Sequence, residues 1–366
     1  MSSYRARPNS WHRVKPDKPS KAGRNGIAAV MIVKNEEKVL ERCLKSLDMV
    51  DQIVVVDTGS TDRTLEIARE FTSDVYIAPK IEPFHFAQAR NYVLQYVNQD
   101  WCITIDADEV VTDGSINVIR KAFWTHSKAI GFSVTFRLFD EKGENPTSLP
   151  KLKIFKHGRW EWQYRVHEVL FAKRQQPPPL VAELPDAVIE HRPSEEKGDR
   201  KKQNLELLEI AVKESPEYVR NGRQLGMEFF AREDWQQAAK YLKLYLDMSK
   251  SDRMDRSETL IHLARCYSNL GRYDMAEQYF AEAVEIAPER REIYYHKAVA
   301  LVKVIRLEEA IQAIDQALAI PAAAKPDFYL NVAGVWDGSA CMEVKEFCEK
   351  TLADAKAEFE RRRTAQ

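Results

Sequence analysis

Two stretches decide the fold: Ile53-Val54-Val55-Val56-Asp57-Thr58-Gly59-Ser60-Thr61-Asp62 and Trp101-Cys102-Ile103-Thr104-Ile105-Asp106-Ala107-Asp108-Glu109. Each begins as an apolar run, which is typical of a parallel strand buried on both faces. Each ends in carboxylates, and ligands of open α/β sheets bind at the carboxyl ends of the strands. Asp106 and Asp108 are two positions apart, so in an extended chain they face the same way. Paired carboxylates of this kind favour a divalent cation that is shared with ligand phosphates. The sequence therefore predicts a site for a metal and a diphosphate.

Length and composition narrow the class of protein. A chain of 366 residues is long enough for two domains. Lys plus Arg (55) and Asp plus Glu (56) nearly balance, which argues against a general polyanion binder. No stretch approaches the roughly 18 apolar residues of a membrane span. The cysteines are odd in number and form no close metal-type pair, so free thiols in a reducing cytoplasm are expected, and a cytoplasmic location with them. These cysteines are Cys43, Cys102, Cys266, Cys341 and Cys348.

Residues 1–26 differ from the rest of the chain. They contain seven Lys or Arg residues, three prolines and a single acid, Asp17. This composition predicts a basic, solvated, flexible arm, and an anion-binding arm is the alternative. The arm has no apolar core of the kind found in secretory signals.

Residues 27–191 alternate between strand and helix, which predicts an α/β domain with a mostly parallel sheet. Shorter strands, some of them antiparallel, are expected from residue 131 onward. Ser60 or Thr61 is expected to cap the helix after the second strand. The expected strands are 27–33, 52–56, 74–78, 101–105, 131–138, 152–155, 168–171 and 187–190, and the expected helices include 36–47, 86–97 and 113–124.

Residues 192–201 are polar, contain Pro and Gly, and predict a linker. An all-helical domain is expected over residues 202–366, because an internal repeat follows the linker. Four residues recur 38 positions later: Phe229, Trp235, Ala238 and Tyr241 become Tyr267, Tyr273, Ala276 and Tyr279. Ala276 and Ala283 recur 34 positions later as Ala310 and Ala317. Large and small residues at a fixed period predict tetratricopeptide-like helix pairs.

Seven motifs in order resemble the family 2 glycosyltransferases, which have the GT-A fold and use nucleotide-sugar donors. With helical repeats after them, the motifs are similar to the bacterial and phage subgroup that includes bacteriocin peptide glycosyltransferases. The resemblance covers about residues 27–320. The motifs are Met31-Ile32-Val33-Lys34-Asn35-Glu36-Glu37, Asp57-Thr58-Gly59-Ser60-Thr61-Asp62, Ala89-Arg90-Asn91, Asp106-Ala107-Asp108, Lys153-Ile154-Phe155-Lys156, Arg165-Val166-His167-Glu168 and Ile189-Glu190-His191.

The resemblance implies a nucleotide site at the ends of the first strands. Asp57 would accept a hydrogen bond from the base or ribose. Asn35 and Glu37 would line the same nucleoside pocket. Arg90 would contact the nucleotide near its ribose or phosphates, and Asp106 would contact the ribose or a metal-bound water. A UDP-sugar is the first expectation for the donor.

The resemblance also implies a metal site and a base. Asp108 and His191 would bind Mn²⁺ or Mg²⁺, with Asp106 as the third candidate ligand. Glu168 would be the general base of an inverting transfer, with Glu161 as its rival. The resemblance assigns less definite roles to two further residues. The glycine at position 158 would bring a tight loop to the donor sugar, and the histidine at position 85 stands where the family often has an acid.

The function implied is a metal-dependent, inverting glycosyltransferase whose repeats bind or orient a protein or peptide acceptor. An anionic acceptor, such as modified DNA or a glycan, is the alternative, although the near-neutral charge does not favour nucleic acid. A non-catalytic repeat scaffold with a relic domain is the alternative of another class. A nucleotidyltransferase would carry a Gly-rich phosphate loop where this chain has Val33-Lys34-Asn35-Glu36. A short repeat also has exposed faces through which copies of the chain can associate.

Overall fold

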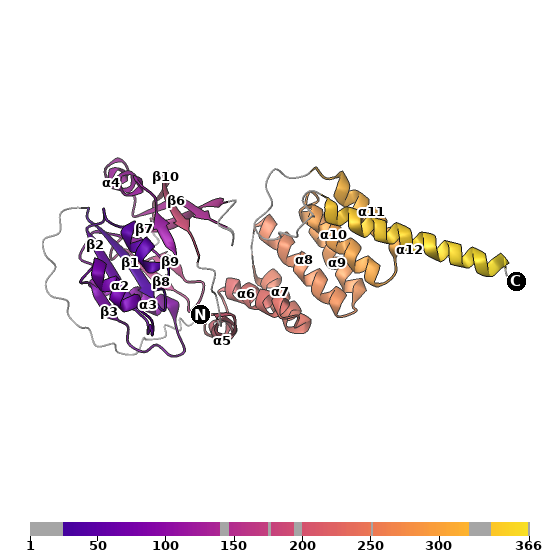
Figure 1. The fold of residues 1–366 in the computed structure, drawn as a ribbon, viewed down its shortest axis with the longest axis horizontal. Helices are drawn as coiled ribbons and strands as arrows, with labels where there is room; N and C mark the ends of the chain where they lie inside the picture. The colour runs from indigo at the N-terminus through magenta and orange to yellow at the C-terminus, as the bar shows by residue number, and fades with distance from the viewer. Residues whose placement is uncertain are drawn as a thin grey trace. The chain divides into compact units, whose positions relative to one another are not determined.

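The computed structural model describes residues 25–139, 146–174, 177–193, 200–249, 252–321 and 338–364. The predicted basic arm (residues 1–26), apart from its last two residues, lies outside the described residues, as does most of the predicted linker. The chain divides into two compact units, Met1–Arg200 and Lys201–Gln366 (Figure 1).

The first unit is built on a mixed, mostly parallel sheet, as predicted. Within the described residues the strand order is β3-β2-β1-β4-β7-β6-β10-β5. The pairs β1–β2, β1–β4, β2–β3 and β6–β10 are parallel, whereas β7 runs antiparallel to both neighbours and β5 runs antiparallel to β10. The strands are β1 (Ile27–Val33), β2 (Gln52–Asp57), β3 (Val75–Ile77), β4 (Trp101–Thr104), β5 (Glu109–Val111), β6 (Gly131–Leu138), β7 (Thr147–Lys156) and β10 (Val181–His191).

Strand β1 explains why the sheet carries a layer on each face. Ile27, Ala29 and Met31 point into one core, and Ala28 and Val30 point into the other. The first core is closed by α1 (Leu40–Lys45), α2 (Thr64–Phe71) and α4 (Ser115–Thr125). The second core is closed by α3 (Phe86–Val93), the short η1 (Leu94–Tyr96) and a separate antiparallel pair, β8 (Trp160–Gln163) with β9 (Val169–Ala172). Strands β5 and β8 were not predicted.

The prediction that Ser60 or Thr61 caps the second helix was wrong. Helix α2 begins at Thr64, and Asp62 Oδ1 accepts a hydrogen bond from the Thr64 backbone N–H at 3.0 Å. The Ser60 N–H and hydroxyl donate instead to the Asp57 carboxylate. The Asp57 side chain therefore shapes the turn before the helix.

The second unit consists of helix pairs that repeat the predicted spacing. The rings of Phe229 and Tyr241 stack with centroids 5.8 Å apart, and their equivalents Tyr267 and Tyr279 stack at 5.4 Å. Alanines at the recurrent small positions are buried and let the paired helices approach closely. The pairs are α6 (Val219–Ala231) with α7 (Trp235–Met248), α8 (Arg253–Asn269) with α9 (Tyr273–Ile286), and α10 (Arg291–Lys303) with α11 (Leu307–Ala319). The predicted tetratricopeptide architecture is confirmed.

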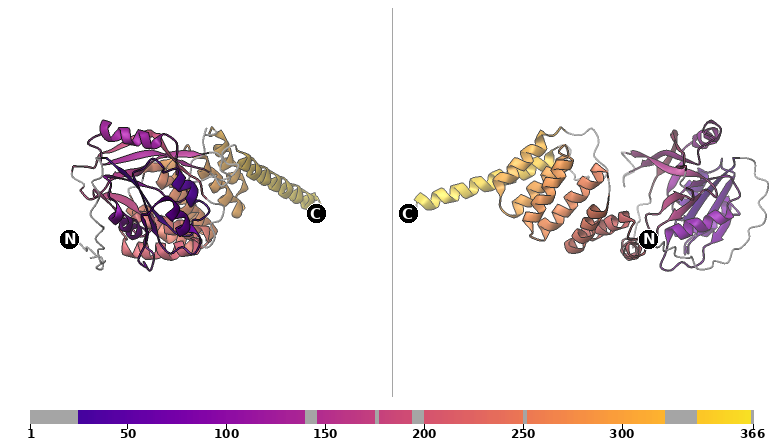
Figure 2. Two further views of the ribbon diagram at one scale, coloured as in Figure 1. Left: turned by 60° about the vertical axis from the view of Figure 1, so that its left-hand side comes forward. Right: turned by 180° about the vertical axis from the view of Figure 1, so that it is seen from behind.

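Two more helices flank these pairs. Helix α5 (Arg200–Glu214) precedes them, and α12 (Ser339–Thr364) follows. The first turns of α12 pack on α10 and α11 through Cys341 and Cys348, while its far end extends beyond the other helices of this unit (Figure 2). All five cysteines are buried and outside disulfides. Among the described helices, none has both the length and the apolar character that a membrane crossing requires.

Candidate active site

Arg90 joins two carboxylates that are far apart in the sequence. Its Nη2 donates to Asp106 Oδ1 at 2.7 Å, and its Nε donates to Glu168 Oε1 at 2.6 Å. Asp106 follows β4, and Glu168 lies in the loop between β8 and β9. The predicted nucleotide contact and the predicted base therefore belong to one cluster at the carboxyl end of β4.

Helix α3 positions this cluster through the three residues of the Ala89-Arg90-Asn91 motif. Ala89 is fully buried, which seats the helix on the sheet. The Asn91 side chain donates to the Trp162 carbonyl at 2.8 Å and accepts from the Trp162 N–H at 2.9 Å. The Trp162 ring in turn lies 5.0 Å from the Arg90 guanidinium carbon. The helix therefore clamps the β8–β9 pair, and with it Glu168, against the end of the sheet.

The loop that carries Glu168 is tied down at a second point. Arg165 donates to the carbonyls of Pro83 and Phe84 at 2.6 and 2.7 Å. His85, whose role the sequence left open, caps α3: its Nδ1 accepts from the Gln88 N–H at 3.3 Å. The segment before α3 and the loop before β9 thus hold each other.

The electrostatics of the cluster follow from this pairing. Burial opposes the charge on Asp106, but the cations Arg90 and Lys153 outweigh it and hold the pKa of Asp106 well below its usual value. Burial also opposes the charge on Arg90, and the two carboxylates reverse that effect and raise its pKa. Asp106 and Arg90 are therefore both charged across the physiological range.

Glu109 and Lys153 form a buried ion pair that sequence reasoning missed. Lys153 Nζ donates to both oxygens of Glu109 at 2.6 Å, and the two side chains are 3% and 1% exposed. Glu109 Oε2 also accepts from the Asp106 N–H at 3.0 Å. Burial raises the pKa of Glu109. The ion pair therefore fixes the Asp106–Asp108 turn through the hydrogen bond from the Asp106 N–H to Glu109. Two sequence features could have indicated this pair: Glu109 directly follows the two aspartates, and Lys153 interrupts an apolar strand.

Asp108 meets His191, as a shared metal site would require. His191 Nε2 lies 3.2 Å from Asp108 Oδ2. The register explains this contact, because His191 at the end of β10 pairs with Glu109 at the start of β5. Asp106, the third predicted ligand, points to Arg90 instead. Across the described ranges, no group of three or more His, Cys, Asp or Glu side chains is arranged to hold a metal ion. A carboxylate and an imidazole fit a divalent ion that takes its other ligands from phosphate and water.

The predicted nucleoside residues lie together at the ends of β1 and β2. Asp57 is 2% exposed and accepts from the Gly59 and Ser60 N–H groups. Asn35, at φ +54°, accepts from the Thr61 N–H through Oδ1 at 2.8 Å. In the same loop, Glu37 Oε2 accepts from the N–H of residue 63 at 3.0 Å. These bonds fasten the loop after β1 to the loop after β2.

Two weaker expectations, the roles of Gly158 and Glu161, are corrected or narrowed. Gly158 turns at φ +74° beside the start of β4, because β7 runs antiparallel to β4 and Lys156 pairs with Trp101. It therefore lies at the opposite end of β4 from Asp106 and cannot approach a donor there. The rival base, Glu161, accepts from Gln163 at 3.0 Å and takes no part in the ion pairs of Arg90.

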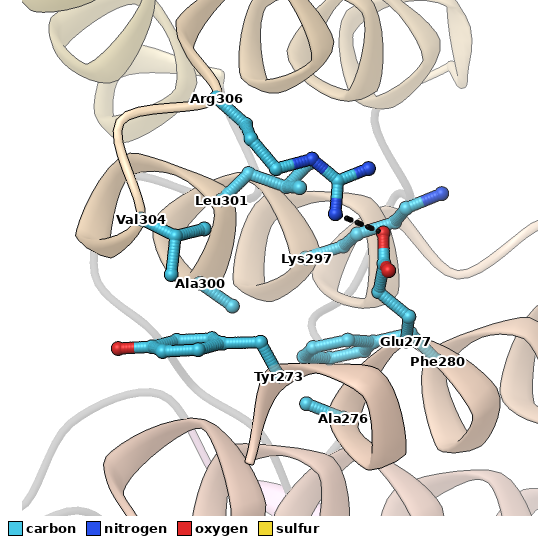
Figure 3. Close-up of a pocket in the computed structure, with 9 residues that line it drawn as sticks. All are labelled: Tyr273, Ala276, Glu277, Phe280, Lys297, Ala300, Leu301, Val304 and Arg306. Carbon is cyan, nitrogen blue, oxygen red and sulfur yellow. Dashed lines mark ion pairs between the residues drawn. The ribbon is translucent and has the colours of Figure 1, made fainter. Parts of the chain in front are cut away.

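A small hollow in the repeat domain is not a substrate site. Figure 3 shows it between α9 and α10, with the Arg306–Glu277 ion pair (2.8 Å) across it. Its volume is about 10 Å³, room for about one water molecule. The lining residues are Tyr273, Ala276, Glu277, Phe280, Lys297, Ala300, Leu301, Val304 and Arg306.

Comparisons with known proteins divide the chain in the same way. Residues 28–174 match the family model "Glycosyl transferase family 2", and residues 223–289 match a tetratricopeptide repeat model. A TPR repeat-containing protein of Synechococcus elongatus is 27% identical over 71% of this chain and 66% of its own length. The lipopolysaccharide core biosynthesis glycosyltransferase LpsC of Rhizobium meliloti is 28% identical over 39% and 56%.

The SPbeta prophage-derived glycosyltransferase SunS of Bacillus subtilis is 34% identical over 26% of this chain and 23% of its own length. The chain thus spans between about a quarter and two thirds of these relatives. Residues 28–174 form a glycosyl transferase family 2 domain, and tetratricopeptide repeats follow it in the chain.

Proposed function

We propose that this protein is a glycosyltransferase that moves a sugar from a nucleoside diphosphate to an acceptor, with inversion at the anomeric carbon. The observation that carries the proposal is the Arg90 bridge between Asp106 and Glu168. It joins a carboxylate suited to the donor with a carboxylate suited to the acceptor. The presence of Asp106, Asp108 and Glu168 together supports an active domain over a relic that serves only as a scaffold, in which these carboxylates would be the first to be lost.

Glu168 is the proposed general base. Its Oε1 is held by Arg90, and within the described ranges no hydrogen bond is made by its Oε2. The acceptor nucleophile forms a bond to the anomeric carbon as the bond from that carbon to the diphosphate oxygen breaks. The acceptor proton passes to Glu168 Oε2, and the electron pair leaves with the diphosphate. Arg90 would hold the Glu168 carboxylate in a fixed orientation during this proton transfer.

Asp108 and His191 are the proposed metal ligands, with Asp106 beside them. A bound Mn²⁺ or Mg²⁺ would neutralise charge on the diphosphate. The Glu109–Lys153 pair holds the turn that carries both aspartates. At the ends of β1 and β2, Asp57, Asn35 and Glu37 would face the nucleoside of the donor, for which uridine is our first choice.

The acceptor is proposed to be a protein or peptide that the repeats recruit. The repeat domain has an apolar groove of about 160 Å³ lined by the end of α5, the start of α6 and the last turns of α7. Leu244 and Met248 line it and are 42% and 49% exposed. A glycan is the second candidate, because one relative, LpsC, is named for lipopolysaccharide core biosynthesis.

Donor hydrolysis tests the reaction without knowledge of the acceptor. A panel of nucleotide sugars with Mn²⁺ should include one from which the enzyme slowly releases nucleoside diphosphate. Asp108→Ala should abolish that release. Leu244→Asp should leave it intact while lowering transfer to a protein acceptor. If no nucleotide sugar binds or is hydrolysed, the proposed reaction is wrong.

A further inference from the structure

The end of the sheet that carries the two aspartates holds a further cation, Lys151, whose ammonium forms no ion pair with a carboxylate among the described residues. Arg90 is engaged by Asp106 and Glu168, and Lys153 is engaged by Glu109. The side chain of Lys151, two positions before Lys153, makes no hydrogen bond or ion pair in the part of the chain that the structure describes. Its Nζ lies 4.0 Å from the centre of the Phe136 ring.

The surroundings of Lys151 place it on the proposed donor side of the cluster. Lys153 Nζ lies 5.1 Å from the same Phe136 ring, so the two lysines lie over one aromatic side chain. The Phe136 ring lies 6.1 Å from the ring of His191, which contacts Asp108. One aromatic side chain thus links Lys151 to the proposed metal ligands.

The charges around Lys151 make it receptive to an anion. Burial lowers its pKa, and the neighbouring cations Lys153 and Arg90 act in the same direction, whereas Glu109 and Asp106 oppose them. The Lys151 side chain is exposed to solvent, and its ammonium lies over the Phe136 ring. An anion that binds Lys151 would accept hydrogen bonds from its ammonium. Because the side chain already contacts the Phe136 ring, little conformational entropy would be lost on binding.

We propose that Lys151 binds the diphosphate of the nucleotide and stabilises the charge that develops on it as the leaving group. This inference rests on the proposed function, because it requires a nucleoside diphosphate in the site. The diphosphate is the fitting anion because the Phe136 ring that contacts Lys151 also lies beside His191, a proposed metal ligand. The Lys151 ammonium and a bound metal ion would both stabilise the negative charge of the diphosphate. Lys151 is not itself a metal ligand.

Calorimetric titration with UDP and UMP, with and without Mn²⁺, tests the inference on the full chain. Lys151→Met should weaken UDP binding roughly tenfold or more, the usual scale for a lost charge-assisted contact, and should change UMP binding less than about twofold. Lys151→Arg should restore most of the UDP affinity. Lys156→Met is the matched control, since Lys156 lies over the Trp101 ring at the other end of β7.

Two results would overturn the inference: unchanged UDP affinity in Lys151→Met, or an equal loss for UDP and UMP. Donor hydrolysis is measured separately on the same variants. If UDP binds through Lys151 but no donor is hydrolysed, the proposed reaction fails while the binding role stands. If the wild type binds no nucleoside diphosphate from a panel of four bases, both proposals fail.

Discussion

Arg90 Nε lies 2.6 Å from Glu168 Oε1, although 78 positions separate the two residues in the chain. The same guanidinium holds Asp106 at 2.7 Å. A planar fork of donors can hold two carboxylates in fixed directions, which an ammonium cannot do. The proposed base and the proposed donor site are therefore positioned by one side chain.

Glu168→Gln should lower sugar transfer by roughly 10²–10⁴-fold, because general base catalysis contributes on this scale. Donor binding should persist, since the amide keeps the shape of the side chain. Transfer rates and nucleotide titrations measure the two effects. Glu161→Gln is the control and should stay active. If Glu161→Gln is inactive and Glu168→Gln is normal, the roles are exchanged.

Arg90→Lys should impair both stability and transfer, because lysine can retain only one of the two carboxylate contacts. Loss of one charge-assisted bond should lower the free energy of unfolding by about 1.5–3 kcal/mol. Urea unfolding measures this loss. Arg63→Lys is the control: its pair with Glu66 is exposed, so a much smaller change in the free energy of unfolding is expected. Equal effects of the two substitutions would contradict the bridging role.

The stability of the protein should depend on Asp106 in acid. The pKa of Asp106 is lowered in the folded state, so its contribution is present above its ordinary value of about 4 and is lost as the pH falls below that value. Asp106→Asn should therefore flatten the dependence of the free energy of unfolding on pH between about pH 5 and pH 2. Parallel pH profiles for the variant and the wild type would show that the lowered pKa does not contribute.

Asp108→Ala should remove metal-dependent binding of nucleotide sugar while the domain stays folded. His191 contributes an imidazole, so Mn²⁺ should support activity at least as well as Mg²⁺. Calorimetry with each ion and circular dichroism of the variant test these points. Full activity in excess EDTA would exclude a metal role for this pair.

Two glycines of α6 should respond in opposite directions to alanine. A Cβ at Gly222 meets nothing within 4 Å, so Gly222→Ala should stabilise the helix by about 0.5–1 kcal/mol. A Cβ at Gly226 would lie 2.9 Å from Leu242 Cγ and 3.1 Å from the Leu242 backbone N. Overpacking of about 1–3 kcal/mol should outweigh the gain in helix propensity there. Urea unfolding of both variants decides whether α6 and α7 pack this closely.

Much of the fold could be predicted because the signals are local. The apolar run predicted over residues 27–33 forms strand β1 with the same bounds, since a strand buried on both faces needs apolar residues at every position. Helix α1 is shorter than the predicted 36–47 because its first residues form a turn, and Val39 provides no side-chain cap. Strand β5 is three residues long, too short for a periodic signal.

The sequence by itself determined the two-domain order, the alternating sheet and the repeat, because hydrophobic period and recurrent spacing are properties of neighbouring residues. Only the tertiary structure decided which charge meets which. It pairs Asp106 with Arg90 and Asp108 with His191, and leaves Lys151 over an aromatic ring. The Asp108–His191 contact follows from the antiparallel pairing of β5 with β10, and the place of Lys151 follows from the antiparallel pairing of β7 with β6. Arg90 reaches Asp106 from helix α3. Strand order and register depend on contacts between distant segments, which local patterns do not encode.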